Sequence, residues 1–205
     1  MIAIVDYKAG NLTSVKLAFD AIGAESVITD RPEVILGAER VVFPGVGAIG
    51  AAMENLRSLG IGDCIREVVG KGTPFLGICL GTQIILERSE EDGNVAGLGL
   101  IPGPVRLFRP RFPKDKVPQI GWNSVVRQCR HPVFNEIRDG TEFYFIHSYY
   151  PAPHVREHVL GVTNYADVTF ASVVGRDNIV ATQFHPERSG RVGLRLLKNF
   201  AEWNV

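Results

Sequence analysis

The sequence predicts an α/β fold built on a mainly parallel, doubly wound sheet with helices on both faces. In the first half, short apolar runs rich in β-branched residues alternate with helix-like segments, a pattern typical of parallel sheets. In the second half, strand-like runs follow one another with little helix between them, which indicates antiparallel strands added to that core. The 205 residues suffice for one buried core, and we expect a single domain spanning residues 1–205.

The first half opens with a predicted strand, Ile2–Asp6, and a helix, Val15–Ile22, for which Asn11 or Thr13 is a candidate cap. A helix-like segment over 82–88 closes it. Between these, in chain order, we expect the strands Ser26–Thr29 and Val41–Phe43, the helices Ala48–Leu59 and Ile61–Val69, and the strand Phe75–Ile78.

The second half consists mostly of strand-like runs and ends in a helix. Ser189 is a candidate cap for this amphipathic helix, whose apolar residues Val192, Leu196, Phe200 and Trp203 share one face. The expected strands are Val105–Phe108, Ile120–Val126, Phe143–Tyr150, Val159–Asn164, Thr169–Val174 and Ile179–Phe184.

Charge and composition exclude several classes of function. Lys plus Arg equals Asp plus Glu at 22 each, so no overall positive field exists to bind nucleic acid or an anionic membrane. A local basic cluster lies in a proline-containing loop, and we interpret it as a solvated loop or a partner-facing edge. Its members are Arg106, Arg109, Arg111, Lys114 and Lys116.

The cysteines and the apolar runs suggest a cytoplasmic protein without a metal. Cys64, Cys79 and Cys129 do not form a disulfide framework, and no CxxC pair indicates zinc. Asp6 and Lys8 lie too early in the chain for the apolar core of a signal peptide. No apolar run approaches the roughly 20 residues of a membrane-spanning helix.

The candidate nucleophile is Cys79, within the run GICLG. It lies where the apolar strand ends and a helix-like segment begins, which is the strand–nucleophile–helix elbow with sulfur in place of the usual serine oxygen. Gly77 and Gly81 leave room for the tight turn. The positive end of a helix dipole and its free N–H groups favour a thiolate. A lone cysteine is more often a small buried hydrophobe, and that reading suffices for Cys64 and Cys129.

A candidate base follows an apolar strand at His185, in the run HPE. In an extended segment His185 and Glu187 leave the same face, so the carboxylate can orient the imidazole and stabilise its protonated form. The alternative is a surface turn with an ion pair. His131, His154 and His158 lie in loop-like sequence without a carboxylate at comparable spacing. His147 lies in a strand, and we interpret it as a core histidine.

Glycines 45, 47 and 50 spell GxGxxG, the dinucleotide-binding pattern. That function also needs an acidic residue at the end of the next parallel strand, where this chain has Ile78 and Cys79. We therefore interpret Gly45, Val46 and Gly47 as a flexible loop whose N–H groups join that of Leu80 to hold an oxyanion. No cofactor is then expected.

These motifs together resemble the class I, triad-type glutamine amidotransferases. Within that family the chain is similar to glutaminase subunits of histidine biosynthesis that act with a separate (β/α)₈ cyclase. Lys8 and Thr82 depart from the usual glycine and methionine, and neither change removes a reactive group. The resemblance rests on DYKAGN (6–11), PGVG (44–47), GICLGTQ (77–83), GWN (121–123), YFIHSYY (144–150) and QFHPERSG (183–190).

The resemblance implies a reaction and a set of residues that carry it. Cys79 attacks the side-chain amide of L-glutamine, His185 transfers the proton with help from Glu187, and water hydrolyses the thioester after ammonia leaves. Gln83, Ser148 and Tyr149 match glutamine-binding positions. Ser148 and Tyr149 can also be ordinary polar residues at a strand end.

The resemblance also implies a partner that receives the ammonia. A (β/α)₈ barrel needs about 250 residues, so we expect the cyclase to be a separate subunit in a heterodimer. Asn11, Trp122 and Tyr144 lie in family motifs apart from the triad, and we expect them at that interface; Trp122 can equally be a core aromatic. Because glycines flank Val46, we expect its peptide to reorient when the partner binds.

Three other functions compete with this one. A glutaminase feeding a different synthase, such as the one making pyridoxal phosphate, is disfavoured by GWN and HSYY. A non-catalytic scaffold is disfavoured by the intact Cys79, His185 and Glu187. A free-standing cysteine hydrolase predicts strong activity without a partner and on other amides or esters.

Overall fold

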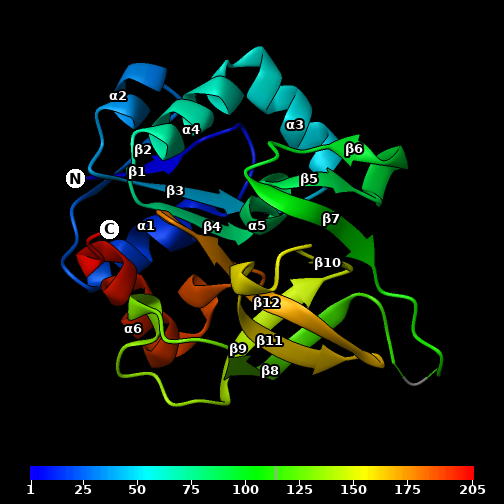
Figure 1. Ribbon diagram of the computed structural model, residues 1–205. Coiled ribbons are helices and arrows are strands. Elements are labelled where there is room, and N and C mark those ends of the chain that lie inside the picture. Colours follow the sequence, from blue (N-terminus) through cyan, green and yellow to red (C-terminus); the bar gives the residue numbers. More distant parts are fainter. Residues whose placement is uncertain (114) are drawn as a thin grey trace.

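The computed structural model describes residues 1–113 and 115–205 (Figure 1). Lys114, one member of the basic cluster, lies outside the described residues. Among the described residues, no helix has both the length and the apolar character needed to cross a membrane.

The core is a nine-stranded sheet in which the first-half strands are parallel. Its strand order is β2-β1-β3-β4-β13-β12-β11-β8-β9; neighbours are parallel from β2 to β13 and antiparallel from β13 to β9. The predicted fold class is thus confirmed. The strands are β1 (Ile2–Val5), β2 (Ser26–Thr29), β3 (Arg40–Gly45), β4 (Phe75–Cys79), β8 (Gln119–Arg127), β9 (Thr141–His147), β11 (Val159–Tyr165), β12 (Val168–Arg176) and β13 (Ile179–Thr182).

Helices cover both faces of the parallel strands. Residues of β1 alternate between two apolar clusters, with Ile4 facing α1 and α6 and Ala3 facing α2, α3 and α4. Figure 1 shows α1 and α6 together on one side and α2 to α4 on the other. The helices are α1 (Leu12–Ala21), α2 (Pro32–Leu36), α3 (Ile49–Ser58), α4 (Ile61–Gly70), α5 (Leu80–Ile84) and α6 (Gly190–Glu202). Four 3-10 helices complete them: η1 (Glu91–Gly93), η2 (Pro132–Phe134), η3 (Arg156–His158) and η4 (Pro186–Arg188).

The helix expected over 82–88 is wrong, because most of this segment belongs to a second, four-stranded sheet. Helix α5 ends at Ile84, and the chain continues as a strand. The carbonyls of Ile84 and Ile85 accept hydrogen bonds from the N–H groups of Leu98 and Leu100, at 2.6 and 2.8 Å, so tertiary pairing replaces further helical turns. This sheet has the order β10-β7-β5-β6, from β5 (Leu86–Ser89), β6 (Val95–Ala96), β7 (Ile101–Leu107) and β10 (Tyr149–Pro151).

The strand predicted over 143–150 is two strands in two different sheets. Strand β9 ends at His147 in the large sheet, Ser148 makes the crossing, and β10 begins at Tyr149 in the small sheet. This break carries Ser148 and Tyr149 from one sheet to the other beside the end of β4.

The predicted side-chain caps do not form. Asn11 and Ser189 occupy the cap positions of α1 and α6, but neither makes a side-chain cap hydrogen bond. The Ser189 hydroxyl donates instead to the His185 carbonyl oxygen at 2.6 Å and accepts from the Tyr144 N–H at 3.0 Å. The His185 N–H donates to the Tyr144 carbonyl oxygen at 2.9 Å, so the HPE segment is tied to the outer edge of β9.

Candidate active site

Cys79 lies in a strained elbow at the end of β4. Its φ of 52° and ψ of −101° are values that a non-glycine residue rarely adopts. A Cβ atom on Gly77 would lie 2.6 Å from the Gly81 carbonyl oxygen, and one on Gly81 would lie 2.1 Å from the Phe43 carbonyl oxygen. Only glycines fit on the two sides of the turn, which therefore holds the thiol at the carboxyl edge of the parallel strands.

His185 and Glu187 form a buried pair, although not from an extended segment. Strand β13 ends at Thr182, and η4 brings the two side chains together, with 2.7 Å between His185 Nδ1 and Glu187 Oε1. Their side chains are 3% and 1% exposed. Because Nδ1 donates to the carboxylate, Nε2 is the ring nitrogen available to a reacting group.

The thiol and the imidazole are electrostatically coupled. Burial alone lowers the pKa of His185, but the negative charge of Cys79 and the hydrogen-bonded Glu187 carboxylate together raise this pKa to about 10. Nε2 has no aligned hydrogen-bond partner among the described residues, so the charge of Cys79 matters more here than a formed hydrogen bond. Catalytic hydrogen bonds are often loose before substrate binds.

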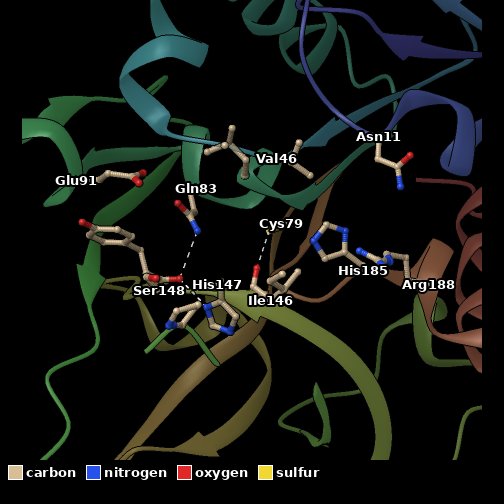
Figure 2. A pocket seen from close by; sticks show the side chains of 14 residues that line it. Asn11, Val46, Cys79, Gln83, Glu91, Ile146, His147, Ser148, His185 and Arg188 are labelled. Atoms are coloured by element: carbon tan, nitrogen blue, oxygen red, sulfur yellow. Dashed lines mark hydrogen bonds between the residues drawn. The ribbon is translucent and has the colours of Figure 1, made fainter. Parts of the chain in front are cut away.

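These groups open onto one pocket of about 330 Å³ (Figure 2). Figure 2 shows Gln83 and Glu91 at one end, Asn11 and Arg188 at the other, and Cys79 with His185 between them. Gly45 and Glu187 do not line this pocket. The predicted site residues that line the pocket are Asn11, Val46, Gly47, Cys79, Leu80, Gln83, Ser148, Tyr149 and His185.

In the loop predicted to hold an oxyanion, Tyr7 binds the backbone of Val46. The Val46 N–H donates to the Tyr7 hydroxyl at 3.2 Å, and that hydroxyl donates to the Val46 carbonyl oxygen at 3.1 Å. Tyr7 is itself fixed by stacking on Phe43, with ring centroids 4.8 Å apart, and burial raises its pKa to about 12. Val46 therefore cannot donate to an oxyanion in this state, which is the resting arrangement expected from its flanking glycines.

Two polar residues of this region, Glu91 and Gln183, were not among the predicted site residues. Glu91 lines the pocket and accepts the Ile49 N–H at 3.0 Å, and burial raises the pKa of its carboxyl group. Gln183 is fully buried and its amide nitrogen donates to Cys79 Sγ at 3.6 Å. A glutamine within the apolar run Ile179–Phe184 was the available signal for Gln183, whereas nothing distinguished Glu91 from its acidic neighbours.

His147 is buried as a core residue would be, yet it lines the pocket. Burial lowers its pKa to about 4, so the ring is neutral at pH 7. Nδ1–H donates to the Tyr149 carbonyl oxygen at 2.7 Å, and Nε2 lies 3.0 Å from Gln119 Oε1. His147 thus holds the crossing between β9 and β10 in place.

Trp122 and Tyr144 lie outside the pocket on the outer face of β8 and β9. They are paired in register, with ring centroids 6.2 Å apart, and Arg188 lies 5.0 Å above the Tyr144 ring. Trp122 is 54% exposed, so it is not a core aromatic. No cluster of three or more potential metal-ligating side chains occurs in residues 1–113 and 115–205.

Comparison with known proteins agrees with this geometry. The family model for class I glutamine amidotransferases matches residues 3–203. The imidazole glycerol phosphate synthase subunit HisH of Nitratidesulfovibrio vulgaris is 48% identical over 205 residues, covering 98% of this chain and 95% of that protein. The HisH subunit of Chlorobaculum tepidum is 48% identical over 204 residues, covering 99% and 100%.

Solved structures show the same fold at low sequence identity. A glutamine amidotransferase crystal structure gives a TM-score of 0.73 at 19% identity, covering 98% of both chains. PurLQS from Thermotoga maritima gives 0.74 at 16% identity, covering 97% of this chain and 96% of that one. The chain therefore belongs to the class I glutamine amidotransferase family, among the HisH subunits of imidazole glycerol phosphate synthase.

Proposed function

We propose that this chain is the glutaminase subunit that hydrolyses L-glutamine to glutamate and ammonia and passes the ammonia to a separate (β/α)₈ cyclase subunit. The cyclase subunit catalyses the lyase step. It forms imidazole glycerol phosphate and an aminoimidazole carboxamide ribonucleotide in histidine biosynthesis. The observation that carries the proposal is Cys79 in its elbow beside the buried His185–Glu187 pair, facing one pocket. The HisH relatives, 47–48% identical, support the synthase assignment.

The geometry supports covalent catalysis by Cys79. The raised pKa of His185 favours a protonated ring beside Cys79. The thiolate attacks the side-chain carbonyl carbon of glutamine, and the proton on His185 Nε2 goes to the departing nitrogen as the C–N bond breaks. His185 then takes a proton from water, which attacks the glutamyl thioester and releases glutamate and the thiol. Glu187 holds the ring and stabilises its charged form.

The pocket offers contacts for both charged ends of a free amino acid. Glu91 supplies a carboxylate for the substrate ammonium. At the same end of the pocket, Gln83, Ser148 and Tyr149 supply polar groups that can bind the substrate carboxylate. We infer that the glutamine side chain runs from there toward Cys79, with the released ammonia leaving on the side of Asn11 and Arg188.

The outer face of β8 and β9 suits the partner. Ile120 and Trp122 are more than half exposed and pair in register with Ile146 and Tyr144. Ile146 and the neighbouring Arg188 also line the pocket, so a subunit docked on this face would cover its mouth. We propose that the interface includes Trp122 and Tyr144 on this face and Asn11 beside the pocket.

The resting loop supports a gated enzyme. A tetrahedral intermediate needs donors at its oxyanion, and the Val46 N–H is engaged with Tyr7. We propose that the bound partner favours a second loop conformation. In it the N–H groups of Val46 and Leu80 both donate to the oxyanion. Gly45 and Gly47 give that loop its freedom; Gly47 already has a φ of +94°. The cytoplasmic location and the heterodimer stay predictions of the same proposal.

The test is glutamate release from glutamine, with and without the cyclase subunit and its nucleotide ligand. We expect weak activity from the free chain, a sharp rise in the complex, and a loss greater than about 10⁴-fold in Cys79→Ala. Cys129→Ser is the matched control because Cys129 is exposed and outside the pocket. Activity without stimulation by the cyclase would indicate another synthase or a free-standing hydrolase, and unchanged activity in Cys79→Ala would refute the nucleophile.

A further inference from the structure

We propose that Gln183 is a further catalytic residue, whose side-chain amide stabilises the Cys79 thiolate by a direct hydrogen bond. The inference rests on the proposed function, because it takes Cys79 as the nucleophile. Gln183 Nε2 lies 3.6 Å from Cys79 Sγ, and Gln183 Oε1 lies 3.3 Å from Gln83 Nε2. The residue is fully buried and lies two positions before His185.

A backbone carbonyl fixes which end of the Gln183 amide faces the sulfur. The Tyr149 carbonyl oxygen can only accept, so the Gln83 atom at 3.3 Å from it is the donor nitrogen. That nitrogen also donates to Gln183, which must therefore present its oxygen to Gln83. The Gln183 nitrogen is left facing Cys79. The hydrogen bonds that link Tyr149, Gln83, Gln183 and Cys79 therefore have one consistent donor-to-acceptor direction. Exchanging the nitrogen and oxygen of either side-chain amide would break this chain of hydrogen bonds.

The sulfur has a competing contact that favours its protonated form. Cys79 Sγ lies 3.9 Å from the Ile146 carbonyl oxygen, which can accept from a thiol but repels a thiolate. Gln183 is closer and can only donate through its nitrogen, so it favours the thiolate. In a buried site such a donor acts strongly on a charge because little water screens it.

The backbone around Gln183 holds the amide in place. Its N–H donates to the Ser172 carbonyl oxygen at 2.9 Å, and the neighbouring Thr182 carbonyl oxygen accepts from Thr82 Oγ1 at 2.6 Å. Because Thr82 belongs to α5, the helix after Cys79, the end of β13, which Gln183 follows directly, is joined to the elbow.

The first experiment follows the reactivity of Cys79 toward iodoacetamide as a function of pH in the full chain. The background is Cys129→Ser, since Cys129 is exposed; Cys64 contributes little near neutral pH because burial raises its pKa to about 11. In Gln183→Leu we expect the alkylation profile to move to higher pH. The rate at pH 7 should fall by about 10- to 100-fold, the size of one hydrogen bond to a charged group.

The control is another buried amide. Asn199→Leu removes donors to the Val133 and Asn135 carbonyl oxygens, away from the pocket, and should leave the alkylation profile unchanged. In the complex with the cyclase, Gln183→Leu should lower kcat for glutamate release by the same factor as the alkylation rate. A change in KM alone would mean that Gln183 acts only by orienting Gln83, which would overturn the proposal.

A second variant keeps the proposal testable if Gln183→Leu does not fold. Gln183→Glu retains an acceptor for Gln83 but places a carboxylate beside the sulfur, so alkylation near pH 7 should be slower still. An alkylation profile like that of the parent in a folded Gln183→Glu or Gln183→Leu variant would refute the role of Gln183. Failure of the parent chain to hydrolyse glutamine would instead refute the proposed function, while the alkylation profile would still report on Gln183.

Discussion

The two sides of the pocket differ in how far they are assembled. On one side, His185 and Glu187 are buried and in contact at 2.7 Å beside Cys79. On the other side, Val46 is 41% exposed and its N–H points to Tyr7. The proposed nucleophile and base are in place, whereas the N–H group of Val46, a proposed oxyanion donor, is not.

The difference follows from what holds each side. Cys79 and Gln183 lie at or next to the ends of core strands, and η4 is tied to β9 through Ser189, so close packing fixes the proposed triad of Cys79, His185 and Glu187. The loop after β3 is exposed, and among the described residues the Tyr7 hydroxyl alone hydrogen-bonds to the backbone of Val46. A partner can therefore change the loop at small energetic cost without disturbing the triad.

Removing the charge of Glu187 tests the assembled side and should have the largest effect. In Glu187→Gln the neutral amide cannot stabilise protonated His185, and we expect kcat to fall on the order of 10²- to 10⁴-fold in the free chain and in the complex alike. Steady-state kinetics of both forms measure this. Glu91→Gln is the matched control, a pocket carboxylate outside the triad, and should raise KM more than it lowers kcat. A loss confined to the complex would contradict the comparison.

Trp122→Ala tests the partner face. A half-exposed tryptophan at an interface centre contributes about 2 kcal/mol to the free energy of binding, so we expect the affinity for the cyclase to fall about 30-fold. The glutaminase activity of the free chain should stay unchanged. Calorimetric titration of the two subunits measures the affinity. Arg176→Ala is the control, since Arg176 ends β12, an interior strand that β11 separates from β8. Unchanged affinity and coupling in Trp122→Ala would place the interface elsewhere.

Tyr7→Phe sharpens the comparison by releasing the loop. Loss of the two hydrogen bonds to Val46 should raise basal glutaminase activity up to about 10-fold and lower the stimulation by the cyclase by a similar factor. Tyr165→Phe is the matched control because its hydroxyl donates to the Lys116 carbonyl oxygen instead. If Tyr7→Phe folds normally and its basal activity does not rise, the hydroxyl does not restrain the loop.

The smallest expected effect concerns histidines that burial keeps neutral. Burial lowers the pKa of His131 and His147 to about 4 in the folded chain, below the ordinary 6.5. Between these values the unfolded chain binds protons that the folded chain does not, so stability falls as pH drops from about 6.5 to about 4. His185 has the opposite sign: its raised pKa stabilises the fold below 6.5, and this contribution is lost as pH rises through about 10.

The acid effect can be measured as Tm against pH. His131→Asn keeps an acceptor for the Val133 N–H and should reduce the fall of Tm between pH 6.5 and 4 by roughly a few degrees. His154→Asn, at an exposed histidine, is the control. An equal fall of Tm in His131→Asn and wild type would show that His131 is not the source.

The sequence by itself determined the parallel core, the antiparallel additions and the identity of Cys79, His185 and Glu187 as candidates. These depend on local signals: β-branched runs, glycines where no Cβ fits, and a carboxylate two residues from a histidine. Tertiary structure alone decided that the chain after Ile84 leaves the helix, that Ser189 ties His185 to β9, that Glu91 lines the pocket, and that Gln183 contacts Cys79. Such features arise from hydrogen bonds between residues far apart in the chain, which local periodicity does not encode.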